Sequence, residues 1–406
     1  MKQKRVVIIG GGAAGFFAAI NLAERQPNYK VIIVEKTSKL LTKVQISGGG
    51  RCNITHSCFD NNELVKSYPR GEKQLKSVFS RFAVQDTINW FEERGIPLHT
   101  EEDGRMFPTS NNAKTISDFF INTAEQLGIE ILLKHEVEAI IQNNTRFEII
   151  IKNNETLQAD AIISTSGGSN KRGGYNYLAQ LNHRIVPPSP SLFTFNINDK
   201  NITKLMGVSM SDVMVSVLGT KLKTKGDLLI THWGMSGPAI LKASAFGATI
   251  LKEQEYKFKL KVNWLPQIKE EALRNLLQEV KSNAPQQLIS KHPQYKIAKR
   301  LWEYFVVRAE INLDCKWVDL SKKQTNKLIN ILHHDEYDVT GKTTFKEEFV
   351  TCGGIDLKEI NLSTMESKIV PNVFFAGEVI DVDGITGGFN FQNAWSTAHI
   401  AANNCL

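Results

Sequence analysis

The stretch that decides the fold is residues 6–35, VVIIGGGAAGFFAAINLAERQPNYKVIIVE. The apolar run 6–9 predicts a strand that ends at Gly10, the alanine-rich segment 13–25 predicts a helix, and the apolar run 31–34 predicts a second strand closed by Glu35. This order predicts a β-α-β unit at the start of a parallel sheet that is covered on both faces. Gly10, Gly12 and Gly15, with an acid 20 residues beyond Gly15, form the fingerprint of a dinucleotide-binding site.

Each residue of the fingerprint has a physical role. Gly10 permits the tight turn, Gly12 lets the backbone approach a pyrophosphate, and Gly15 lets the helix and strand pack closely. The helix N-terminus offers the phosphates N–H groups and a partial positive charge. The Glu35 carboxylate accepts hydrogen bonds from a ribose diol and disfavours a 2′-phosphate, so FAD and NAD are the two candidates.

Two further glycine-rich segments favour FAD. One is Ser47–Asn53, and the other is Ala376–Glu378 followed by Thr386–Asn393. FAD is long, so a segment from the far end of the chain must cover its ribityl and isoalloxazine parts. Gly388–Asn390 lead into a helix and are expected to aim N–H groups at the flavin N1/C2 edge, which stabilises reduced flavin. No second GxGxxG occurs, so NAD(P)H is expected only as a transient co-substrate.

The remaining chain alternates between helical and strand patterns. Helices are predicted at 85–94 and 115–127, and strands at 129–133, 137–141, 147–151 and 161–164. Pro187–Pro190 predicts a domain boundary. Residues 191–262 favour strands, and 267–335 carry the three- and four-residue spacing of helices. The α/β pattern returns at about residue 345 with a strand at 373–376 and a terminal helix at 394–403, so an α/β domain is interrupted by a mixed insert.

Composition narrows the class of protein. The chain has 406 residues, 42% hydrophobic and 22% charged, which is typical of globular proteins. No apolar run approaches the length of about 18 residues that a membrane span needs. The N-terminus lacks the pattern of a signal peptide. Five scattered cysteines and nine histidines form no metal-ligand spacing, so no metal site is expected, and a reducing cytoplasm is the simplest compartment.

The positive charge is concentrated in the insert. Residues 191–339 hold 22 lysines and arginines against 15 acids, an excess of seven that equals the net charge of the chain. A solvated basic face or an acidic partner explains this excess. Nucleic acid is the disfavoured partner because no basic run carries interleaved aromatic residues.

The sequence resembles a known family. Seven segments follow the order seen in bacterial FAD-dependent oxidoreductases of the two-dinucleotide-binding type, which include aminoacetone oxidase and a proposed bile-acid dehydro-reductase: Gly10–Gly15, Ser47–Asn53, Gly104–Pro108, Gly167–Gly168, His232–Ala239, Val350–Gly354 and Phe375–Gly384. The resemblance spans nearly the whole chain. Cys352 departs from it, because the family commonly has alanine there, and a change in packing is expected.

The resemblance implies the fold and its divisions. It implies a Rossmann-like FAD-binding domain interrupted by a β-barrel and a helical subdomain. The predicted parts are residues 1–190 and 346–406 for the FAD-binding domain, 191–262 for the barrel, 263–336 for the helices and 337–345 for a return strand.

The resemblance also places residues around the cofactor. It implies that Gly50–Asn53 line the cofactor, that Val137 meets the adenine, and that Gly377 and Glu378 lie near the pyrophosphate and ribityl chain. Together with the fingerprint, the predicted cofactor-binding residues are Gly10, Gly12, Ala14, Gly15, Glu35, Lys36, Gly50, Arg51, Cys52, Asn53, Val137, Ser166, Gly167, Gly377, Glu378, Gly388, Phe389 and Asn390.

No catalytic residue is assigned from the sequence. The candidates are His232, as a base or phosphate donor, and Arg51, as a cation near phosphate or flavin. Ser236 lies in the same short loop as His232. A redox disulfide between Cys52 and Cys58 is disfavoured because five residues separate them, whereas flavin–disulfide reductases have four.

The leading hypothesis is an FAD-dependent oxidoreductase. A small substrate would enter between the flavin domain and the insert and exchange a hydride with flavin N5, and oxygen or NAD(P)H would close the cycle. The alternatives are an RNA-associated flavoprotein whose insert docks nucleic acid through Lys221, Lys223 and Lys225, and a flavin-binding regulator with little turnover. The substrate, the electron acceptor and the oligomeric state stay open.

Overall fold

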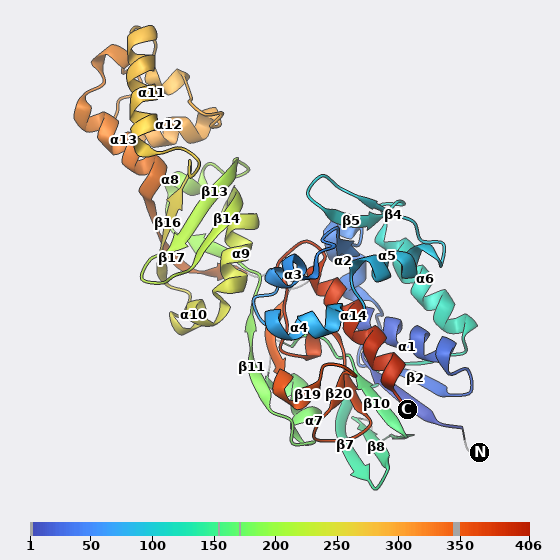
Figure 1. Ribbon diagram of the computed structural model, residues 1–406. Coiled ribbons are helices and arrows are strands. Elements are labelled where there is room, and N and C mark those ends of the chain that lie inside the picture. Colours follow the sequence, from blue (N-terminus) through green and yellow to red (C-terminus); the bar gives the residue numbers. More distant parts are fainter. Residues whose placement is uncertain (1–2, 153–154, 170–171, 344–349) are drawn as a thin grey trace. The chain divides into compact units, whose positions relative to one another are not determined.

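The computed structural model describes residues 3–152, 155–169, 172–343 and 350–406, and the chain forms two compact units (Figure 1). Unit 1 comprises Met1–Pro190 and Lys346–Leu406, and unit 2 comprises Ser191–Phe345. Each unit has its own hydrophobic core. The predicted fold class, a Rossmann-like domain interrupted by an insert with a β-barrel and helices, is confirmed.

A seven-stranded sheet forms the centre of unit 1. Its strands, in spatial order, are β19 (Ile360–Asn361), β20 (Glu366–Ser367), β21 (Val373–Phe375), β10 (Ala161–Ser164), β1 (Arg5–Ile9), β2 (Lys30–Glu35) and β6 (Glu130–Leu133). The five strands from β21 to β6 are parallel, whereas β19 and β20 are antiparallel additions. The chain runs from β1 outward to β2 and β6, and then from β10 outward to β21. The order therefore reverses between β1 and β10, where open α/β sheets bind their ligands.

The helices of unit 1 are α1 (Ala13–Arg25), α2 (Thr42–Gly50), α3 (Asn61–Leu64), η1 (Val65–Ser67), α4 (Glu72–Phe79), α5 (Val84–Glu92), α6 (Ala113–Gln126), η2 (Arg172–Tyr175), α7 (Asn176–Ala179), η5 (Leu357–Glu359), η6 (Gly377–Val379) and α14 (Phe389–Asn404). Among them, α1 and α14 contact this sheet and are buried along most of their length. The two ends of the chain meet where α1 packs against α14 (Figure 1). Phe17, Trp90 and Trp395 join α1, α5 and α14 through ring contacts of 4.2 and 5.2 Å between centroids.

Three small sheets complete unit 1. They are β3 (Thr55–His56) with β5 (Arg105–Pro108) and β4 (Leu98–Thr100), β7 (Val137–Asn143) with β8 (Arg146–Ile151) and β9 (Thr156–Ala159), and β11 (Ile185–Pro190) with β18 (Thr351–Ile355). The prolines predicted to mark a boundary lie inside β11, at a register shift between Val186 and Ser189. A proline has no N–H to donate, and a bulge in a two-stranded ribbon tolerates it.

Unit 2 contains the closed barrel. Its strand order is β12 (Thr194–Ile197), β15 (Gly234–Ser236), β14 (Lys223–Thr231), β13 (Ser209–Val217), β16 (Phe258–Asn263) and β17 (Asp335–Thr343). Alternate residues fill the barrel, such as Val213, Val215 and Val217 of β13, because successive side chains of a strand point to opposite faces. The segment predicted to favour strands also holds the helices α8 (Lys200–Thr203), α9 (Pro238–Phe246) and α10 (Ala248–Glu253).

The helical part of unit 2 lies between β16 and β17. It consists of α11 (Glu270–Asn283), η3 (Ile289–Lys291), α12 (Lys299–Arg308), η4 (Trp317–Asp319) and α13 (Lys322–His334). Ser321 caps α13 by accepting from the Gln324 N–H, as its residue type favours. The strand predicted to return over 337–345 begins at Asp335. Residues 344–345, and the predicted start of the second flavin segment at 346, lie outside the described residues.

Candidate dinucleotide site

The predicted cofactor residues gather at the carboxyl ends of the parallel strands of unit 1. Gly10 and Gly12 follow β1, Ser166 and Gly167 follow β10, and Glu35 ends β2. Gly377 and Glu378 follow β21, which is the next strand beyond β10. Residues from four strands therefore surround the point where the strand order reverses.

Two of the fingerprint glycines, Gly10 and Gly15, are tightly packed, and the third, Gly12, borders open space. Gly10 has φ +116°, and a Cβ there would lie 2.5 Å from the Thr165 carbonyl oxygen. A Cβ on Gly15 would lie 1.9 Å from the Gly10 carbonyl oxygen. At Gly12, by contrast, a Cβ would meet no atom within 4 Å. Gly12 is the N-cap of α1, and no side chain caps the helix there, so the open space beside Gly12 lies next to the uncapped N–H groups of the helix.

Glu35 has a role that its sequence position did not reveal. Its Oε2 accepts from the Gly11 N–H at 2.9 Å and its Oε1 accepts from the Thr37 N–H at 2.8 Å. The carboxylate therefore ties the glycine loop to the end of β2. Each carboxylate oxygen has a second lone pair, so the predicted contact with a ribose diol is chemically compatible with these bonds. Its neighbour Lys36 is exposed, and Val137 is half-buried at the start of β7.

The glycine-rich segment before Asn53 is a left-handed turn. Gly48, Gly49 and Gly50 have φ of 58°, 70° and 83°, a region that favours glycine. A Cβ on Gly49 would meet no atom within 4 Å. Arg51 is not a bare cation: its guanidinium pairs with Glu101 at 2.5 Å and lies 4.0 Å from the centre of the Phe107 ring.

Asn53 connects this turn to the start of α14. With its amide oriented to satisfy all of its partners, it donates to Met106 O at 3.1 Å and Thr55 O at 2.9 Å, and accepts from the Gly388 N–H at 3.0 Å. The Gly388 N–H, predicted to face the flavin, is thus engaged by Asn53. The later N–H groups of this first turn have no acceptor within the helix.

The two residues after Gly388 are held by unit 1 itself. Phe389 stacks on His56 with 4.8 Å between ring centroids. The Asn390 side chain accepts from the Gly384 N–H at 2.8 Å and donates to the Gly384 carbonyl at 2.9 Å. These contacts fix the loop that leads into α14.

Glu378 and Gly377 occupy the β21 side of the site. Gly377 lies against α1, since a Cβ on it would be 2.9 Å from Cβ of Ala14. Glu378 accepts from the Gly168 N–H at 3.4 Å and pairs with Lys43 of α2 at 2.5 Å. A Cβ on Gly167, φ +74°, would meet no atom within 4 Å. Sequence reasoning missed Lys43 because its partner lies 335 residues away.

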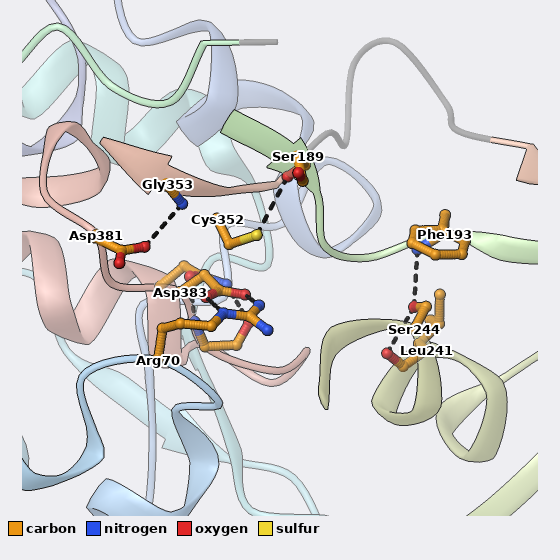
Figure 2. Close-up of polar contacts among 11 residues, drawn as sticks. Arg70, Ser189, Phe193, Leu241, Ser244, Cys352, Gly353, Asp381 and Asp383 are labelled. Atoms are coloured by element: carbon orange, nitrogen blue, oxygen red, sulfur yellow. Dashed lines mark hydrogen bonds and ion pairs between the residues drawn. The ribbon is translucent and has the colours of Figure 1, made fainter. Parts of the chain in front are cut away.

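A second group of residues missed by the sequence supports the loop between β21 and α14. Figure 2 shows the guanidinium of Arg70 facing the carboxylate of Asp383, which it binds through Nε at 2.5 Å and through a second nitrogen. Asp381 accepts from the Gly353 N–H at 2.9 Å. The Cys352 thiol contacts the Ser189 carbonyl at 3.5 Å, so this cysteine is packed inside unit 1.

The two cysteines near the site differ in burial. Both are free thiols. Cys52 is fully buried, and this burial raises its pKa to about 12. Cys58 is half-buried, and burial followed by the charges of Glu63 and Asp60 raises its pKa. Since the thiolate is the reactive form, burial protects Cys52 from reagents in two ways.

At pH 8, iodoacetamide is expected to label Cys58 of the native protein well before Cys52. Peptide mass mapping over time measures both rates, and labelling in urea gives the unfolded reference. Equal labelling of both thiols in the native protein would contradict the burial.

The raised pKa of Cys52 also makes the stability depend on pH. Its neutral form stabilises the fold fully below about pH 9, and this contribution is lost as the pH rises toward 12.

The candidates in the insert belong to unit 2. His232 is exposed between β14 and β15, with its ring centroid 4.0 Å from that of Trp233, and Ser236 ends β15. Lys221 and Lys223 are exposed, whereas Lys225 pairs with Asp212 at 2.8 Å.

Neither a membrane helix nor a metal cluster is found in the part of the chain that the structure describes. No helix there has both the length and the apolar surface needed to cross a membrane. No three histidine, cysteine, aspartate or glutamate side chains gather there as metal ligands.

Comparisons with known proteins cover almost the whole chain. The model of the HI0933-like protein Rossmann domain matches residues 4–404. A ribosomal RNA dihydrouridine synthase of Haemophilus influenzae is 31% identical over 411 residues, 98% of this chain and 97% of the relative. A 3-dehydro-bile acid delta(4,6)-reductase of Clostridium scindens is 26% identical over 415 residues, 98% of each chain.

A solved structure gives the same fold. The 3-ketosteroid delta1-dehydrogenase of Sterolibacterium denitrificans, in complex with 1,4-androstadiene-3,17-dione, aligns with a TM-score of 0.52 over 99% of both chains. Only 10% of the aligned residues are identical, so this similarity concerns the fold alone.

Proposed function

The chain belongs to the family of the HI0933-like protein Rossmann domain, and from this membership we propose that it is an FAD-dependent reductase that converts uridine of ribosomal RNA to dihydrouridine. The observation that carries the proposal is the 31% identity, over 98% of the chain, to a relative named for that reaction. The resemblance to the family predicted from the sequence motifs is confirmed by the family match.

The chemistry of the relatives supports the reaction class. Dihydrouridine forms when two hydrogens add to the C5–C6 double bond of uracil, which is conjugated to the C4 carbonyl. A delta(4,6)-reductase of a 3-dehydro bile acid adds hydrogen to double bonds conjugated to a 3-oxo group. In a conjugate reduction of this kind, a hydride would add to the carbon remote from the carbonyl and a proton to its neighbour.

The residues of the site fit FAD. The space beside Gly12 at the start of α1 is open, as an anionic diphosphate requires, and the edge of Gly167 is open as well. Glu35 has lone pairs left for ribose hydroxyls, and Glu378 offers a carboxylate to the ribityl chain. When bound, FAD supplies hydride transfer at N5.

The chain's own residues would bind the FAD and position it. The α1 turn would hold the diphosphate, Glu35 the ribose, and the first turn of α14 the pyrimidine edge of the flavin. NAD(P)H is the proposed electron donor. His232 stays the candidate base or phosphate donor that the sequence offers. Its location in unit 2 also puts it in the unit with the excess of basic residues.

The basic excess of unit 2 supports an RNA substrate. Lysines and arginines release counterions from phosphates, and this favours RNA at low salt. The absence of basic runs with aromatic residues disfavoured nucleic acid, whereas the similarity to an rRNA-modifying relative favours it. Ribosomal RNA presents unpaired loops, whose splayed-out bases an enzyme can reach.

The test is a reaction of the purified protein with FAD, NADH or NADPH, and ribosomal RNA transcribed without modifications. Nuclease digestion and mass spectrometry are expected to reveal uridines heavier by two hydrogens. Parallel arms contain free uridine and a steroid with a 4,6-diene-3-one. Turnover of the steroid alone would reject RNA as substrate but keep the reductase, and a protein that does not bind FAD would reject the whole proposal.

A further inference from the structure

One ion pair bridges the candidate dinucleotide site. The Lys43 ammonium lies 2.5 Å from Oε2 of Glu378. Lys43 is on α2, whose N-terminus is anchored where the Leu41 N–H donates to the Gly11 carbonyl at 2.9 Å. Glu378 is in η6, directly after β21. Lys43 therefore reaches Glu378 from a helix anchored to the loop that follows β1, and β10 lies between β1 and β21 in the sheet.

The two partners differ in burial. The Glu378 side chain is 12% exposed, whereas that of Lys43 is 48% exposed. Glu378 also accepts from the Gly168 N–H on the β10 side. The carboxylate is therefore fixed, and the lysine reaches to it from solvent.

The charge of Glu378 matters because of the site it borders. Its loop follows the same edge of the sheet as the open face of Gly12 and Gly167. A dianionic diphosphate at that face would be repelled by a bare carboxylate nearby, since charges interact strongly where solvent is partly excluded. Lys43 is the cation that the structure pairs with this carboxylate.

We propose that Lys43 is a dinucleotide-binding residue, whose ammonium neutralises Glu378 and so makes the site accept an anionic diphosphate. This inference rests on the proposed function only for the identity of the dinucleotide, FAD. Lys43 acts here through its positive charge, so an arginine at this position should largely preserve FAD binding, whereas a glutamine should not.

The test is a titration of the wild type and of the variants K43Q, K43R, E378Q and K43Q/E378Q with FAD. Binding is measured by the quenching of FAD fluorescence. K43Q is expected to weaken FAD binding by about 30-fold, and K43R by only a few-fold. In the E378Q background, the K43Q substitution should cost less than about fivefold, because no carboxylate is left to neutralise.

K39Q is the matched control, since Lys39 is an exposed lysine four residues earlier. It should change FAD affinity by less than about twofold. Thermal unfolding without FAD checks that each variant is folded. Wild-type affinity in folded K43Q, or equal losses from K43Q in both backgrounds, would overturn the inference. A wild type that binds no FAD would instead refute the proposed function.

Discussion

Replacing Arg70 by methionine is expected to lower the free energy of unfolding by about 3–5 kcal/mol. The Asp383 side chain is fully buried and that of Arg70 is 19% exposed, so solvent screens this pair poorly. The substitution would take the bidentate guanidinium away from the buried Asp383 carboxylate, and breaking a buried ion pair by removing one partner is costly. The backbone of the two residues is also bridged, so the effect should reach the loop between β21 and α14.

Urea denaturation gives the size of the effect, and hydrogen exchange of α1 and α14 locates it in unit 1. Arg146→Met is the matched control, because its 3.0 Å pair with Asp160 has side-chain exposures of 44% and 21%. That change should cost less than about 1 kcal/mol. The double variant R70M/D383L should regain part of the loss, since it removes both charges. Equal losses for Arg70→Met and Arg146→Met would show that the Asp383 pair is not a structural anchor.

Gly15→Ala is expected to destabilise unit 1 by about 3 kcal/mol or more, at the top of the usual range for overpacking. The new Cβ would lie 1.9 Å from the Gly10 carbonyl oxygen and 2.9 Å from Oγ1 of Thr165. The first of these atoms is backbone, so it cannot rotate away. Helix α1 would have to move from β1, and the packing of α1 against α14 would be lost with it.

Gly12→Ala is the control for this prediction, three residues away in the same fingerprint. Its Cβ meets no atom within 4 Å, and its φ of −98° is open to any residue. Urea midpoints without FAD should therefore be close to wild type for Gly12→Ala and strongly lowered for Gly15→Ala. Similar midpoints for both would contradict the packing of the glycine turn.

Local patterns made the first β-α-β unit predictable. The predicted helix over 13–25 has the bounds of α1, and the strands at 6–9 and 31–34 each extend by one or two residues in the structure. Apolar runs, helical spacing and the glycines act within a few residues there. Helix α14 begins at Phe389 and not at 394. Gly388, with φ +95°, is its N-cap, and the residues that follow include buried polar side chains, which an apolar pattern does not indicate.

Tertiary contacts explain what the sequence did not reveal. Strands β4 and β5 have only three and four residues, and their patterns are too brief to predict them. Lys43 and Arg70 have partners 335 and 313 residues away, so only the topology of the sheet brings them together. The glycines and Glu35 could be predicted because their chemistry lies inside one motif, whereas the second role of Glu35, at the Gly11 N–H, depends on how the loop folds back.

The most direct test of the account is FAD titration of the Gly12→Val variant, because the central claim places a diphosphate on the open face of the α1 turn. The variant should unfold near the wild-type temperature without FAD, since a Cβ at this position meets no atom within 4 Å. Its affinity for FAD should fall by about 100-fold or more, since the side chain would occupy the place of charge-assisted hydrogen bonds to phosphate. A folded Gly12→Val protein that binds FAD as tightly as the wild type would contradict the account.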